Sequence, residues 1–122
     1  MDNHFKQNTN LRDRIRNSSV VIDKYYPDKV PVVIQKLARE TCLPELKKHK
    51  FLIPGNMSYS SFLIYLRGIL TTTVCPSTAI FLTTEGGHMM CSNEKMLNVY
   101  QNHSDNQDNF LYLFYCSENT FG

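Results

Sequence analysis

Four cysteines and four histidines are the most chemically reactive side chains of this sequence. The cysteines are Cys42, Cys75, Cys91 and Cys116, and no two of them form a CxxC pair. This spacing excludes a zinc ribbon and a thioredoxin-like redox site. His88 and Cys91 have a spacing found between metal ligands, but no second pair completes a site. We therefore expect no metal, no cofactor, and free, reduced thiols that are mostly structural.

Motifs for phosphate binding and for hydrolysis are missing from the sequence. It contains no GxxxxGK[ST] loop, no GxSxG nucleophile elbow and no HExxH helix. Gly86-Gly87 is followed by His and Met, so a hairpin-type turn explains this pair better than a phosphate cradle. We expect that the protein is not an enzyme.

Lys47-Lys48-His49-Lys50 is the only basic run. It is either a solvated loop that leads into a strand or a patch that meets acidic residues of a partner. The second interpretation arises because the run abuts the apolar segment 51–53, where Lys50 and Phe51 would project from opposite faces of a strand. Nucleic-acid binding is not favoured, because 13 Lys and Arg face 11 Asp and Glu and no aromatic stacking platform accompanies the run.

The elements that must position these side chains belong to one small domain. The chain has 122 residues, and 42% of them are hydrophobic, which suffices for a buried core. The longest apolar stretch, 110–116, is much shorter than the ~18–20 residues of a membrane span. The polar N-terminal residues lack the apolar region of a secretory signal.

The N-terminal part predicts two short helices. Leu11 and Ile15 lie four residues apart, which suits one face of a helix. Asn17-Ser18-Ser19 interrupts this pattern, and a serine of this triplet is expected to cap a second helix that continues to Lys24. The residue before Pro27 is pushed out of the helical region, so the second helix ends there.

The remaining elements follow from apolar periodicity. Apolar residues at helical spacing predict helices over 57–70 and 95–101. Strands are predicted over 30–35, 50–53, 79–83, 88–91 and 110–115. Pro31 cannot donate to a ladder, so it should lie at a sheet edge or at a strand start. The last strand is apolar on both faces and is expected to be central. Two helices followed by ββαββαβ describe an α+β fold, a ubiquitin-like β-grasp with two extra N-terminal helices.

Four motifs occur in a fixed order along the chain. They are YPDKVPVV at 26–33, RETCLP at 39–44, KFLIP at 50–54 and FLYLFYCSENTFG at 110–122. They resemble the YPDRVPVIV, RET-x-LP, KFLVP and FLYMxYxSxxTFG signatures of ubiquitin-like autophagy modifiers of the light-chain-3 and GABA-receptor-associated-protein type. The resemblance runs from about Leu11 to Gly122, with small insertions.

This resemblance implies a modifier that acts in autophagosome formation and is not an enzyme. Its C-terminal glycine, here Gly122, would be joined to phosphatidylethanolamine by activating, conjugating and processing enzymes that recognise Thr120 and Phe121. The protein would be cytoplasmic, and autophagosomal when lipidated. The chain then divides into a flexible N-terminus (1–10), a ubiquitin-like domain with its N-terminal helical pair (11–116) and a conjugation tail (117–122).

The resemblance also implies a surface for autophagy receptors and adaptors that carry a [W/F/Y]-x-x-[L/I/V] motif, which adds as a strand to the sheet edge. A first pocket for the aromatic residue maps to Ile22, Pro31, Val33, Lys50, Leu52 and Phe110. A second pocket for the aliphatic residue maps to Phe51, Ile53, Pro54, Met57, Phe62, Tyr65 and Leu66. Arg67 is what remains of the family's basic cluster after the central helix. Periodicity alone favours an ordinary core role for the apolar members of both sets.

The alternative from another class is an unconjugated β-grasp interaction module, such as a cytoskeletal or trafficking adaptor that uses its N-terminal helices. Such a module does not need Gly122. Two departures from the family pattern predict a divergent member in either case. An acidic residue of the family aligns near Ser18, and a basic pair before the first helix is replaced by Thr9-Asn10.

Overall fold

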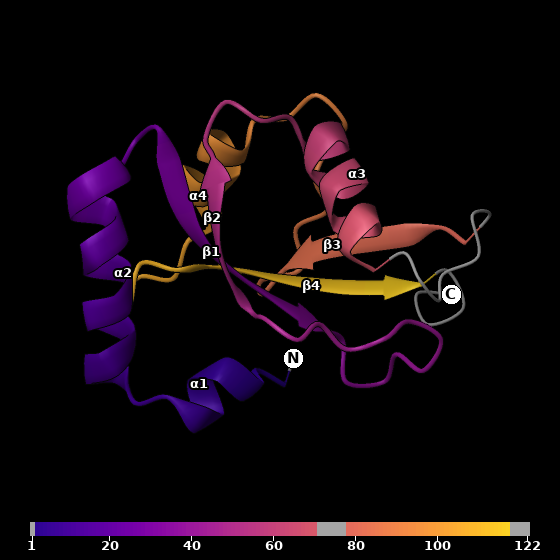
Figure 1. Cartoon of the computed structure of the whole chain (residues 1–122), viewed down its shortest axis with the longest axis horizontal. Coiled ribbons are helices and arrows are strands. Elements are labelled where there is room, and N and C mark those ends of the chain that lie inside the picture. The colour runs from indigo at the N-terminus through magenta and orange to yellow at the C-terminus, as the bar shows by residue number, and fades with distance from the viewer. Residues whose placement is uncertain (1, 71–77, 118–122) are drawn as a thin grey trace.

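A four-stranded mixed sheet organises the computed structural model, which describes residues 2–70 and 78–117 (Figure 1). The sheet has the order β2-β1-β4-β3 and consists of β1 (Lys29–Lys36), β2 (Lys50–Pro54), β3 (Ile80–Thr84) and β4 (Leu111–Ser117). The central pair β1 and β4 is parallel, and the two edge strands pair antiparallel. Four helices pack around it: α1 (His4–Asn8), α2 (Leu11–Tyr25), α3 (Tyr59–Ile69) and α4 (Met96–His103).

The sheet has a core on each face. The larger core joins β-strand residues such as Val32 and Leu113 to Phe62 and Leu66 of α3 and to α4. The smaller core is formed by Val33, Phe110, Tyr112 and Phe114, against which Phe5 of α1 packs. All seven residues of β4 are buried between two neighbouring strands. This confirms the predicted central strand and accounts for its apolar residues on both faces.

Pro31 lies near the start of β1 rather than at a sheet edge. It is opposite Leu52 of β2, and the parallel pairing of β1 with β4 begins one residue later, at Val32. The missing N–H of Pro31 therefore precedes the β4 ladder and costs no bond in it. Of the two positions that the sequence allowed, the strand start is the one observed.

The predicted helix break at residues 17–19 is wrong, because α2 is continuous from Leu11 to Tyr25. The helix begins at Asn10, whose side chain accepts a hydrogen bond from the N–H of Asp13. Ser18 is fully buried, and its hydroxyl donates to the backbone carbonyl of Asp108 at 2.5 Å. The same hydroxyl also lies 3.1 Å from the Ile15 carbonyl of its own helix, so Ser18 has a local and a long-range acceptor and α2 continues past it.

Helix α1 lies in the segment that was expected to be flexible. Buried Asn3 caps it by accepting from the N–H of Lys6, and the amide of Gln35 on β1 donates to the same Asn3 oxygen at 3.0 Å. The Lys6 Nζ contacts Asp105 at 2.5 Å. Burial lowers the pKa of Lys6, but the hydrogen bonds to Asp105 and Glu85 outweigh this effect and raise it overall. These contacts hold residues 3–8 against the sheet.

The Gly86-Gly87 turn is present, but the strand predicted after it is not. Gly87 has a φ of 94°, and the N–H of Thr84 donates to the His88 carbonyl at 3.0 Å. Beyond the turn only an isolated bridge joins Met89 to Thr83. The N–H of Cys91 donates to the Glu94 side chain at 3.1 Å, which draws the chain into a further turn. A strand over 88–91 is therefore a wrong prediction.

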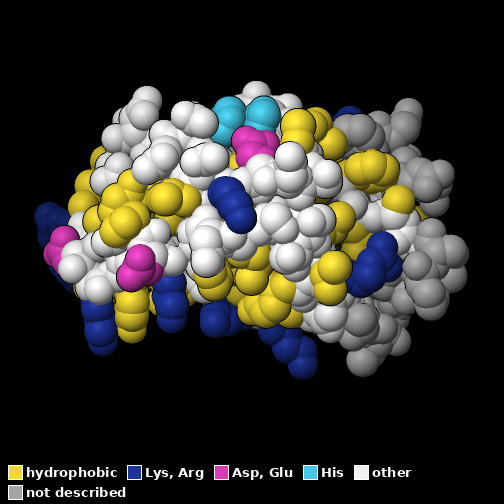
Figure 2. Space-filling model, turned by 90° about the horizontal axis from the view of Figure 1, so that it is seen from above, with side chains coloured by type: hydrophobic (Ala, Val, Ile, Leu, Met, Phe, Trp, Pro, Cys, Tyr) yellow, Lys and Arg dark blue, Asp and Glu magenta, His cyan; other side chains and the backbone are white. Residues whose placement is uncertain are grey.

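The reactive side chains do not gather into a metal site in the described residues. His88 instead stacks on His103 at 4.1 Å between ring centroids and contacts Glu94. Figure 2 shows two histidine side chains side by side on the surface, next to an acidic side chain. Cys91 and Cys116 are free thiols, and Cys75 lies outside the described residues. Within the same residues no helix is long and apolar enough to cross a membrane.

Gly55→Ala tests the turn that links β2 to α3. A Cβ at Gly55 would lie 2.7 Å from the Pro27 carbonyl oxygen and 3.2 Å from the Leu97 Cβ. Because Gly55 is buried and one of these neighbours is a backbone atom, we expect a loss of about 2–3 kcal/mol in the free energy of unfolding, measured by urea denaturation. Gly68→Ala in α3 is the control, since its Cβ would meet nothing within 4 Å. A similar small effect of both changes would contradict the close approach.

Candidate functional site

Strand β2 offers a free backbone edge. Among the described residues it lies at the end of the sheet and pairs only with β1, from Lys29 opposite Pro54 to Val33 opposite Lys50. Its side chains alternate, with Phe51 and Ile53 buried and Lys50 exposed. Figure 1 shows β2 between α2 on one side and α3 on the other. An edge of this kind presents unpaired N–H and C=O groups to which another strand can bind.

A first hollow of about 300 Å³ lies between α2 and β2. It is lined by Asn17, Val20, Val21, Pro31, Lys48, Lys50, Phe51, Leu52 and Phe110. Four of the six residues predicted for the aromatic pocket, namely Pro31, Lys50, Leu52 and Phe110, meet here. The other two lie elsewhere: Val33 is fully buried in the smaller core, and Ile22 lines a separate hollow beside Tyr26 and Tyr100.

The wall that α2 contributes to the first hollow was missed by the sequence analysis. Val20 and Val21 follow Asn17 at offsets of three and four, so all three residues share one helix face. This face exists only because α2 continues through residues 17–19. Reading the helix as continuous would have revealed the pattern.

A second hollow of about 520 Å³ lies on the other face of β2, beside α3. It is lined by Pro44, Glu45, Leu46, Lys47, Lys48, Phe51, Tyr65, Ile69 and Leu70. Phe51 and Tyr65 are the two predicted residues found here, with their rings edge to face at 6.5 Å between centroids. Most of the wall comes from residues 44–48, a segment of the β1–β2 connection that the sequence analysis assigned to no pocket.

The other residues predicted for the second pocket do not line this hollow. Ile53, Phe62 and Leu66 are buried in the larger core, and Met57 packs against it. Pro54 is half-buried at the end of β2. Arg67 donates to the backbone carbonyl of Thr78.

The basic run forms a rim shared by the two hollows. Lys48 lines both of them, as Phe51 does, and its Nζ lies 5.3 Å from the centre of the Phe51 ring. Lys50 belongs to the first hollow and Lys47 to the second. The one acidic side chain among the described lining residues is Glu45, which is exposed and lies 3.5 Å from Lys36. The rim therefore carries a net positive charge.

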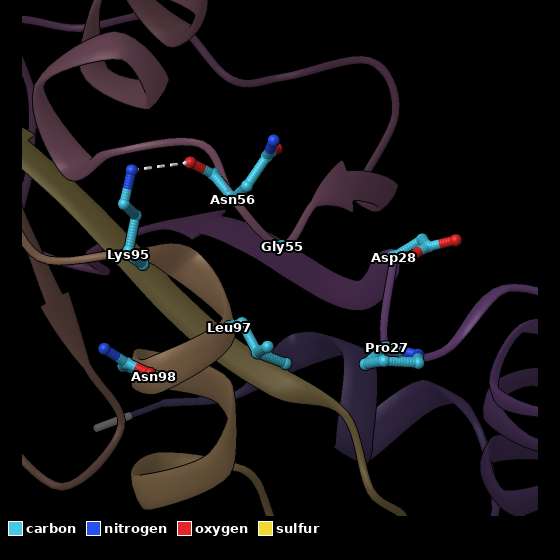
Figure 3. Close-up of a pocket in the computed structure, with 7 residues that line it drawn as sticks. All are labelled: Pro27, Asp28, Gly55, Asn56, Lys95, Leu97 and Asn98. Carbon is cyan, nitrogen blue, oxygen red and sulfur yellow. Dashed lines mark hydrogen bonds between the residues drawn. The ribbon is translucent and has the colours of Figure 1, made fainter.

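A further hollow of about 510 Å³ lies apart from these two (Figure 3). It is lined by Pro27, Asp28, Gly55, Asn56, Lys95, Leu97 and Asn98. Leu97 lies between Lys95 and Asn98 on one side and Pro27 and Asp28 on the other, and the Lys95 Nζ donates to the Asn56 carbonyl at 3.2 Å. This hollow shares no residue with the two beside β2.

The fold and the edge-strand groove define a ubiquitin-like α+β protein with two additional N-terminal helices. A family model described as "Autophagy protein Atg8 ubiquitin like" matches residues 13–122. The crystal structure of Trypanosoma brucei ATG8 is similar with a TM-score of 0.85 and 25% sequence identity, over 97% of each chain.

Relatives agree in sequence over nearly the whole chain. "Autophagy-related protein 8D" of Oryza sativa subsp. japonica is 38% identical over 118 residues, which cover 97% of this chain and 96% of the relative. Human "Microtubule-associated protein 1 light chain 3 gamma" is 34% identical over 119 residues, which cover 97% of this chain and 78% of the relative. The chain therefore belongs to the Atg8 family of ubiquitin-like autophagy proteins, which confirms the resemblance and the fold class expected from the sequence.

Proposed function

We propose that this protein is a ubiquitin-like modifier that is attached through Gly122 to phosphatidylethanolamine and that recruits partners to the edge of β2. The partners carry an aromatic-x-x-aliphatic segment that adds to the sheet as a strand. The observation that supports recruitment is the free edge of β2 with one apolar hollow on each of its faces. Membership of the Atg8 family supports the attachment.

The spacing of the motif fits the two hollows. Side chains of an extended chain alternate between faces, so residues at positions i and i+3 point to opposite faces. The aromatic residue enters the first hollow, over Pro31, Leu52 and Phe110. The aliphatic residue enters the second hollow, beside Tyr65 and Ile69. Backbone hydrogen bonds to β2 set the register, and the two hollows provide the specificity.

The charge of the rim extends this recognition to acidic residues near the motif. Lys47, Lys48 and Lys50 surround the hollows, and acidic side chains of the partner pair with them. The stem of Lys50 covers the aromatic ring while its ammonium group remains in solvent.

The attached lipid determines where the protein acts. The protein is cytoplasmic before attachment, and the two acyl chains then hold it on the autophagosomal membrane, since each buried CH₂ contributes about 0.8 kcal/mol. Activating, conjugating and processing enzymes of the family handle the end of the chain at Thr120 and Phe121. The protein itself recruits partners to the membrane, and it is not an enzyme.

Phe51→Ala combined with Leu52→Ala tests the groove. A peptide with the motif should bind the unchanged protein with a Kd of roughly 1 μM, and the double variant should bind about 30-fold more weakly, equivalent to about 2 kcal/mol. Isothermal titration measures the affinity, and circular dichroism checks the fold. Leu97→Ala, which truncates an apolar residue in the separate hollow, should leave the affinity unchanged. Identical titration curves for a folded double variant would refute the groove.

A further inference from the structure

The wall of the second hollow is an irregular segment that other parts of the chain hold in place. Residues 37–49 connect β1 to β2 without any helix or strand, and residues 44–48 within them line the hollow. Leu43 and Leu46 are buried in the larger core and anchor the segment by apolar contact. Apolar contacts alone do not define the backbone position of such a segment, because the hydrophobic effect is non-directional.

Glu40 supplies the directional contacts. Its side chain is buried, with 2% of the residue exposed. One carboxylate oxygen, Oε2, accepts hydrogen bonds from the N–H groups of Cys42 and Leu43 at 2.7 and 2.8 Å. The other, Oε1, accepts from the N–H and the hydroxyl of Ser117 at 2.6 and 2.9 Å. Glu40 thus joins residues 42 and 43, directly before the wall, to the last residue of β4.

A second bond ties the same segment to β4. The hydroxyl of Tyr115 donates to the Pro44 carbonyl at 2.6 Å. Burial raises the pKa of Tyr115 well above its ordinary value, so the hydroxyl keeps the proton that it donates. Strand β4 is central and fully buried, which makes it a rigid reference for the wall.

We infer that Glu40 is a positioning residue for the second hollow. Its carboxylate holds residues 42 and 43 against the end of β4, which fixes the start of the wall at 44–48 and thereby sets the affinity for the aliphatic anchor of a bound peptide. This inference rests on the proposed function. Glu40 touches no ligand and acts only through the segment that it holds. Its main effect is therefore expected at the aliphatic position, because Lys48 alone among residues 44–48 also lines the first hollow across β2.

Two peptides separate this role from a general loss of stability. One carries the aromatic-x-x-aliphatic motif, and the other has alanine in place of the aliphatic residue. For Glu40→Gln we expect the motif peptide to bind about five- to tenfold more weakly and the alanine peptide to change by less than about twofold. Glutamine keeps the length of the side chain but replaces one acceptor oxygen by an N–H₂ donor that faces N–H groups. Titrations are followed by NMR well below the unfolding temperature.

Control variants define the outcomes. Glu94→Gln makes the same chemical change beside His88 and should alter neither affinity. Should Glu40→Gln fail to fold, two other variants replace it: Ser117→Ala removes the hydroxyl bond to Glu40, and Tyr115→Phe removes the hydroxyl bond to the Pro44 carbonyl. Each should weaken the binding of the motif peptide alone, by about two- to threefold. Equal weakening of both peptides, or no weakening in a folded Glu40→Gln, would overturn the inference. Failure of the unchanged protein to bind the motif peptide would instead overturn the proposed function.

Discussion

Deleting Gly122 is expected to abolish lipid attachment completely while folding and peptide binding remain unchanged. The resemblance to the family implies that the glycine carboxylate is adenylated with ATP, transferred as a thioester between cysteines of partner enzymes and joined to the lipid amine as an amide. Without a Cβ, glycine passes through a narrow enzyme channel and permits close backbone approach. With Gly122 deleted, the reacting position would be occupied by Phe121, whose side chain would hinder the close backbone approach that glycine permits.

The measurement is a lipidation assay with the activating and conjugating enzymes of the family, ATP and phosphatidylethanolamine liposomes. Mass spectrometry of the purified protein identifies the amide. Gly86→Ala is a matched control, because a Cβ there meets nothing within 4 Å, and it should be lipidated normally. A lipid-linked chain without Gly122 would contradict the assignment. An unchanged protein that binds peptide but accepts no lipid would favour the unconjugated interaction module instead.

Asp108→Ala is expected to cause the largest loss of stability of any substitution considered. Asp108 is fully buried, and its Oδ2 accepts from the Arg14 Nε at 2.8 Å and from the Tyr112 hydroxyl at 2.5 Å. Burial raises the pKa of Tyr112 far above its usual range, so the hydroxyl remains a donor. Alanine would leave the Arg14 cation buried without its carboxylate. Such a change costs about 3–5 kcal/mol in the free energy of unfolding.

The same substitution should also weaken peptide binding at the first hollow. Arg14 attaches α2 to the side chain of Asp108, and α2 carries Val20 and Val21 at the wall of that hollow. We expect weaker binding of the motif peptide at temperatures where the variant is still folded, together with the lower urea midpoint.

Two controls test the cause of this loss. Asp23→Ala on the exposed side of α2 should change the stability by less than about 0.5 kcal/mol. Replacing both Arg14 and Asp108 by leucine should cost less than Asp108→Ala alone, because no charge is then left unpaired. A loss below about 1 kcal/mol for Asp108→Ala would show that the buried pair does not hold α2.

Elements with a strong local pattern could be predicted from the sequence. The predicted strand over 110–115, the predicted helix over 57–70 and the predicted strand over 30–35 overlap β4, α3 and β1, respectively, to within two residues at each end. In each case the apolar residues of the element recur at the spacing of its buried face, so the local sequence is enough to predict whether it is a helix or a strand. The edge-strand residues Lys50 and Phe51 were placed beside the hollows by their resemblance to the family rather than by periodicity.

Only the tertiary structure decided how polar groups in irregular or ambiguous segments are satisfied. Ser18 reads locally as a helix break, yet its bond to Asp108, ninety residues away, keeps α2 continuous and creates the wall at Val20 and Val21. Residues 44–48 carry no periodic pattern and become a wall because Glu40 binds Ser117 across 77 residues. Buried polar groups require partners wherever the chain provides them, and the identity of a distant partner is not contained in the local sequence.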